Sequence, residues 1–170
     1  YQGGQSITSH LIGLGKTSFA FIGDNGDHAP EFKARFNGYF ETLHSHGLDQ
    51  SSVQRNAIST EDAGSEAVKS LLQSGELPQA IVCASDLIAM GVLRALRQAK
   101  VNVPDDVAVV GYDNIAVSAY TTPSLTTVQQ NTKLAGELLV NTLLKAINNE
   151  DVQDYLMPAD IIIRQSCGSE

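Results

Sequence analysis

Short apolar runs rich in β-branched residues recur along the chain and alternate with longer amphipathic stretches. Runs of this kind are typical of buried strands in a parallel sheet. Each run is followed by small or polar residues and then by a helical pattern. The predicted strands cover residues 18–22, 53–58, 80–84 and 107–112.

The helices between these strands are predicted from apolar spacing and from their caps. An aromatic stripe begins at Phe32, recurs at helical spacing and ends at Gly47, so we expect it to face the core. Ser59-Thr60 and Ser85-Asp86 precede two further helices as candidate caps. Four strand–helix units in sequence predict an α/β fold, with an open parallel sheet flanked by helices and right-handed crossovers.

The rhythm changes after Pro123. A short extended piece at 126–130 leads into a helix predicted from Thr132 to about Asn148, followed by a last strand at 161–163 and a polar tail. The apolar residues of this helix are Leu134, Leu138, Leu139, Leu143 and Ile147.

Composition and charge limit the classes of partner. The 170 residues are 42% hydrophobic, which is enough for one domain or two small lobes, and no apolar run approaches the roughly 20 residues that span a bilayer. The chain begins without the basic and then apolar pattern of a secretory signal, so we expect a cytoplasmic protein with Cys83 and Cys167 reduced and no membrane partner. A net charge of −8 without a basic cluster predicts that this chain does not itself bind nucleic acid.

Polar side chains follow each predicted strand, and in a parallel sheet they share one edge. They include Ser59, Ser85 and Asp113, and ligands of open α/β sheets bind at this edge. The pattern therefore predicts a site for a small polar molecule. The alternative is that the serines only cap helices, although capping and ligand contact are compatible.

Motifs for catalysis, cofactors or metals are weak. The chain has no Gly-x-Ser-x-Gly elbow, no phosphate loop and no Gly-x-Gly-x-x-Gly after a strand. His44 and His46 lie two residues apart on a helix and point to different faces. A loop with Asp24, Asp27 and His28 is a minor alternative as a metal site. We expect no catalytic residue, no cofactor and no metal.

Several motifs resemble the effector-binding domain of the LacI/GalR transcription regulators. They are Gly111-Tyr-Asp-Asn114, Tyr120-Thr-Thr-Pro-Ser-Leu-Thr-Thr127, Ser85-Asp-Leu-Ile-Ala-Met-Gly91 and Pro104-Asp-Asp-Val107. The resemblance implies a periplasmic binding protein-like type I fold with two lobes. It assigns residues 1–126 to the carboxy-terminal lobe, 127–150 to a crossover and helix of the amino-terminal lobe, and 151–170 to a returning strand and tail.

The same resemblance assigns effector-binding residues. Arg35 lies in Arg35-Phe-Asn-Gly-Tyr39, which is similar to the family's Arg-x-x-Gly-aromatic segment, and Asp113 matches its ligand-gripping aspartate. Ser85 stands where relatives place a polar contact, and Ser59 where they often place an aromatic ring. Gln130 matches a crossover glutamine. On the residues alone, Arg35 could instead lie on a solvated helix face and Gln130 in an exposed linker.

The function implied is that of a sensing domain in a bacterial LacI-type regulator. A sugar or related metabolite would control DNA binding through a helix-turn-helix headpiece absent from this chain, which would be the only part to contact operator DNA. The regulator would be a homodimer that pairs partly through residues 115–123. A periplasmic sugar-binding protein of a transporter and an α/β enzyme are the alternatives.

Overall fold

The computed structural model describes residues 1–24, 26 and 29–169 and confirms the α/β class. One six-stranded sheet has the order β2-β1-β3-β4-β5-β6. All neighbouring strands are parallel except β6, which runs antiparallel to β5 at the edge. The strands are β1 (Phe19–Ile22), β2 (Ser52–Arg55), β3 (Ala80–Cys83), β4 (Ala108–Asp113), β5 (Thr126–Gln130) and β6 (Ala159–Ile162).

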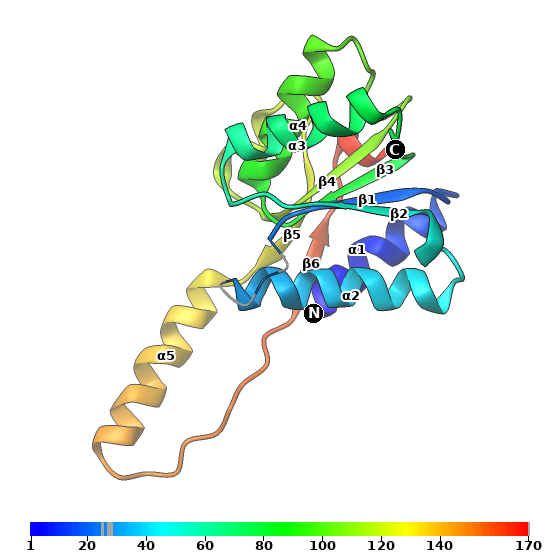
Figure 1. Ribbon diagram of the computed structural model, residues 1–170. Coiled ribbons are helices and arrows are strands. Elements are labelled where there is room, and N and C mark those ends of the chain that lie inside the picture. The colour runs from blue at the N-terminus through cyan, green and yellow to red at the C-terminus, as the bar shows by residue number, and fades with distance from the viewer. Residues whose placement is uncertain (25, 27–28, 170) are drawn as a thin grey trace.

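Helices cover both faces of the sheet (Figure 1), with α1 and α2 on one face and α3 and α4 on the other. Their bounds are α1 (Gln2–Gly13), α2 (Pro30–Ser45), α3 (Glu61–Ser74), α4 (Asp86–Gln98) and α5 (Thr132–Ile147). Short 3-10 helices are η1 (Asp49–Ser51), η2 (Ala116–Tyr120) and η3 (Gln165–Cys167). The layered arrangement buries β1, β3 and most of β4 completely.

Glycines allow the helices on each face to pack closely. A Cβ added at Gly64 or Gly91 would lie 2.2 or 1.8 Å from a backbone carbonyl oxygen of the facing helix. Gly4 and Gly38 make the same kind of approach between α1 and α2. Because glycine has no Cβ, the backbones of the two helices can come closer at these positions than any other residue would allow.

Two details of the predicted pattern are wrong. The strand expected at 53–58 ends at Arg55, and Ile58 is 66% exposed on the loop that leads to α3. The aromatic stripe of α2 is also narrower than expected, because Phe40 is exposed and stacks on the ring of His44 at the protein surface. The sequence does not show whether another element covers an apolar residue at the end of a strand or at the margin of an apolar helix face.

The helix α5 projects away from the sheet, and the segment after it returns to β6 (Figure 1). None of its residues is buried, and apolar side chains such as Leu139, Leu143 and Ile147 are exposed. The chain then re-enters the packed part, where Cys167 is buried. Among the helices of the described residues, none has the length and hydropathy needed to cross a membrane.

Candidate functional site

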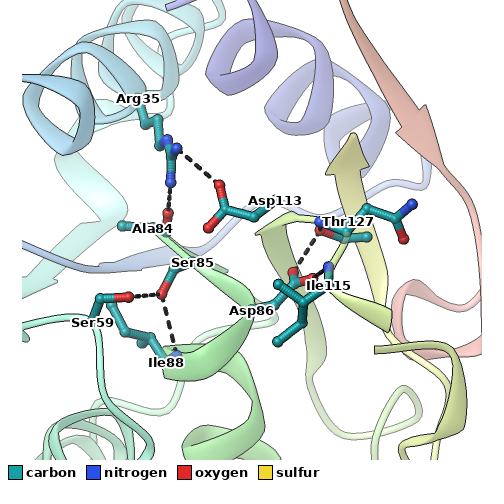
Figure 2. A network of polar contacts seen from close by, with 10 residues as sticks. Arg35, Ser59, Ala84, Ser85, Asp86, Ile88, Asp113, Ile115 and Thr127 are labelled. Carbon is teal, nitrogen blue, oxygen red and sulfur yellow. Dashed lines mark hydrogen bonds and ion pairs between the residues drawn. The ribbon is translucent and has the colours of Figure 1, made fainter. Parts of the chain in front are cut away.

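The carboxyl edge of the central strands holds a cluster of polar side chains (Figure 2). Asp113 ends β4, Ser85 follows β3, and Arg35 reaches the same place from α2. Ser59 joins them from the loop before α3. Four of the five predicted site residues are thus brought together by the parallel order of the strands.

Arg35 is buried, with 8% of its surface exposed, so the alternative of a solvated helix face is wrong. Its Nη2 donates to Asp113 Oδ1 at 3.0 Å, and its Nη1 donates to the carbonyl oxygen of Ala84. The guanidinium also lies over the ring of Tyr112, 3.8 Å from the centroid, and 5.3 Å from that of Phe32. These contacts fix a planar cation at the edge of the sheet.

Asp113 has an unusual backbone conformation. Its φ is +108° and that of Asn114 is +52°, and such conformations in residues other than glycine cost about 1–3 kcal/mol each. The turn directs the Asp113 carboxylate toward Arg35, while 37% of its side chain stays exposed. A carboxylate held beside an arginine and open to solvent can accept hydrogen bonds from a ligand's hydroxyl or N–H groups.

The electrostatics of the pair are set by burial. Burial raises the pKa of the Asp113 carboxyl above its ordinary value, and the neighbouring Arg35 guanidinium opposes that rise. Burial likewise raises the pKa of the Tyr112 hydroxyl. Removing water from charged groups strengthens their hydrogen bonds to a ligand that fills the site.

Ser59 and Ser85 form a hydroxyl pair. Their Oγ atoms are 2.8 Å apart, and Ser85 Oγ also accepts the Ile88 N–H at 3.4 Å as the N-cap of α4. Thr60, not Ser59, caps α3, because its hydroxyl accepts the Ala63 N–H at 3.2 Å. The capping interpretation therefore holds for Ser85 and not for Ser59, which is exposed and contacts the site through Ser85.

Gln130 lies at the end of β5 and is exposed. Burial raises the pKa of the Tyr112 hydroxyl and the Gln130 side chain opposes that rise, which places Gln130 near the ring that underlies Arg35. Of the five predicted site residues, Gln130 is the one that lies at the margin of the cluster.

Other residues support the cluster from within the fold, and the sequence alone did not mark them as site residues. Asp86, expected as a helix-capping residue, is completely buried, and its carboxylate accepts from Thr127 Oγ1 at 2.6 Å and from the Ile115 N–H at 2.9 Å. Arg164 donates to Asn114 Oδ1 at 2.7 Å. The contact between the Asp86 carboxylate and the Thr127 hydroxyl joins residues far apart in the sequence, so residue spacing along the chain could not predict it.

Among the described residues, neither the cysteines nor the acidic side chains form a metal-binding group. Cys83 and Cys167 are both buried and free. Within the described part of the chain, no group of three His, Cys, Asp or Glu side chains is arranged to hold a metal ion. Asp27 and His28 of the alternative metal loop lie outside the described residues, while Asp24 accepts the Gly26 N–H within its own turn.

Comparison with known proteins gives consistent matches across nearly all of the chain. The family described as "Periplasmic binding protein-like domain" matches residues 8–167. The HTH-type transcriptional repressor PurR of Glaesserella parasuis is 33% identical over 96% of this chain and 51% of its own length. The ribose operon repressor of Escherichia coli K12 is 35% identical over 96% of this chain and 49% of its own.

A solved structure agrees in fold. A LacI family transcriptional regulator from Enterococcus faecium with bound ribose superposes with a TM-score of 0.88 at 25% identity, covering 97% of this chain and 62% of that one. The chain spans about half the length of the curated relatives it matches.

Proposed function

We propose that this chain, which belongs to the periplasmic binding protein-like family and within it to the LacI-type repressors, is the small-molecule-sensing domain of a bacterial transcription regulator. The observation that carries the proposal is the Arg35–Asp113 pair, buried on one side and open on the other at the carboxyl edge of the sheet. Arg35, Asp113, Ser85 and Ser59 would contact the effector, with Gln130 at the margin.

The proposed effector is a small polar metabolite such as a sugar. Asp113 can accept from hydroxyl groups, a guanidinium such as that of Arg35 can donate to ligand oxygens, and the serine pair can donate or accept. Ribose bound to the Enterococcus faecium relative supports a sugar.

The chain supplies one wall of the proposed cleft. We assign residues 1–126 to the carboxy-terminal lobe, 127–150 to a crossover and helix of a second lobe, and 151–170 to the return. The exposed apolar face of α5 supports this division, because such a face is typical of a helix that packs against another surface. Effector binding between the lobes would bias their closure and so couple to a DNA-binding headpiece in the cytoplasm.

A thermal-shift screen tests the proposal. The protein carrying both proposed lobes is heated with ribose and with panels of sugars, nucleosides and amino acids. A true effector at 100 times its Kd stabilises the folded state by about 2.7 kcal/mol. A sensing role also predicts that the compound is recovered unchanged, in line with the two relatives named as repressors. Turnover of the stabilising compound, or no shift with any panel, would contradict a sensing role.

Dimerisation is the second proposal, through the segment 115–123. It carries η2, whose Tyr120 is 84% exposed beside the exposed Val117, an apolar surface that does not cover its own lobe. We expect a dimer by light scattering at micromolar concentration for the protein with both lobes, and a monomer after Tyr120→Asp. Leu14→Asp, at an exposed apolar position on another element, is the matched control and should stay dimeric. A wild-type monomer would remove the idea.

A further inference from the structure

The turn that presents Asp113 is held from behind by a buried polar network (Figure 2). Both oxygens of Asp86 are engaged, Oδ1 by the Thr127 hydroxyl and Oδ2 by the backbone N–H of Ile115. Asp86 has no exposed surface, and an added Cβ at Gly111 would lie 2.2 Å from its Oδ1. The carboxylate therefore fits a space that β4 leaves open only because residue 111 is glycine.

Further contacts hold Asn114, which follows Asp113 and also has a positive φ. Thr127 Oγ1 donates to Asp86 and receives the Asn114 N–H at 3.4 Å. The Asn114 side chain is held by β5 and by the segment after β6: its Oδ1 accepts from Arg164 at 2.7 Å and its Nδ2 donates to Gln129 at 3.0 Å. The Asp113 side chain pairs with Arg35, so the network fixes the backbone that follows Asp113 and not its carboxylate directly.

Such anchoring has a physical purpose at this turn. Residues with positive φ persist only where the surroundings determine them, because their intrinsic preference is for other conformations. Without an acceptor at Asp86, the Ile115 N–H would be left without its partner and the turn would relax toward negative φ. A rotation of the backbone at Asp113 would swing its carboxylate away from Arg35.

We infer that Asp86 is a positioning residue for the site, which holds the turn at 113–115 so that the Asp113 carboxylate meets the Arg35 guanidinium. It does so together with Thr127 and does not itself contact ligand. The same turn is the start of η2, where the Ser118 N–H donates to the Ile115 carbonyl at 2.9 Å. The geometry of the site and that of the exposed segment 115–123 thus share one anchor. Only the identification of the site as an effector site rests on the proposed function.

The network is tested without a ligand by nuclear magnetic resonance of the 15N-labelled protein. In the wild type, the Arg35 guanidinium signals, identified by their loss in Arg35→Lys, should show the protection of a paired group, and the Ile115 amide should exchange slowly. In Asp86→Ala and in Thr127→Val we expect the Ile115 exchange rate to rise at least about tenfold and the Arg35 signals to lose their protection. Thr127→Ser keeps the hydroxyl and should restore both signals.

Asp62→Asn is the matched control, because Asp62 is in the first turn of α3, as Asp86 is in that of α4, but its side chain is 91% exposed. It should leave both signals unchanged. Wild-type Arg35 signals in Asp86→Ala and Thr127→Val would overturn the inference, as would an equal rise in exchange at the amides of β1 and β3, which indicates general loosening. If Asp86→Ala does not fold, Thr127→Val decides on the same signals.

The link to function is measured separately in the protein with both lobes, by isothermal titration with ribose and with any compound that the thermal screen selects. Asp86→Ala should weaken binding at least about tenfold. Absence of binding by the wild type would refute the proposed sugar effector, whereas the resonance data on Arg35 and Ile115 would still decide on the positioning role.

Discussion

Replacing Arg35 with alanine is expected to abolish effector binding in the protein that carries both proposed lobes. The substitution removes the cation from Asp113, the donor to the Ala84 carbonyl and the contact with the Tyr112 ring. Losing one member of a buried, hydrogen-bonded charge pair at a binding site costs about 2–5 kcal/mol. That loss corresponds to a weakening of affinity by about 30- to 4,000-fold.

Isothermal titration of the effector found by the thermal screen measures this loss. Arg94→Ala is the matched control, because Arg94 pairs with an exposed Asp62 on the helix surface, where such a pair contributes at most about 1 kcal/mol to stability. Arg35→Lys keeps the charge but loses the planar fork, so it should bind more weakly than the wild type and more tightly than Arg35→Ala. Unchanged affinity in Arg35→Ala would remove Arg35 from the site.

The strands and helices of the packed lobe were predictable because their signal is local. Val107 to Val110 form an apolar β-branched run that only a buried strand accommodates, and Gly75 adopts the left-handed conformation that ends α3. The convergence of Ser85 and Asp113 followed from one further rule, that the carboxyl ends of parallel strands share an edge. These elements needed no knowledge of which surfaces meet.

The rest depended on contacts between distant residues. Asp86 looks in sequence like one more acidic residue in the first turn of a helix, and only the approach of Thr127, 41 residues later, turns it into a buried hydrogen-bonded carboxylate. Arg35 likewise has no local mark of burial, and the prediction for it came from a family resemblance. Ile58 shows the converse: its sequence predicted a buried strand residue, but β2 ends at Arg55 and Ile58 is exposed.

Gly91→Ala is expected to produce the largest loss of stability among single-methyl changes on the α4 surface. The added Cβ would lie 1.8 Å from the carbonyl oxygen of Glu61, a backbone atom that cannot rotate away. The clash can be relieved only if α3 and α4 move apart. That movement would also break the contact between Gly64 and the Ile88 carbonyl in the same helix crossing. Overpacking of this kind costs about 3 kcal/mol. The melting temperature should fall by about 6–12 °C for a chain of this size.

Calorimetry that compares Gly91→Ala with Gly13→Ala separates this steric effect from the low helix propensity of glycine. Gly13 lies in the last turn of α1 with nothing within 4 Å of an added Cβ, so alanine there should be neutral or stabilise by up to about 1 kcal/mol through its higher helix propensity. The same propensity gain applies at position 91 and opposes the clash, so the net loss at Gly91 measures how closely the two helices must approach. If Gly91→Ala melts with the wild type, α3 and α4 are able to separate without cost, and the layer that carries Ser59 and Ser85 to the site is not rigid.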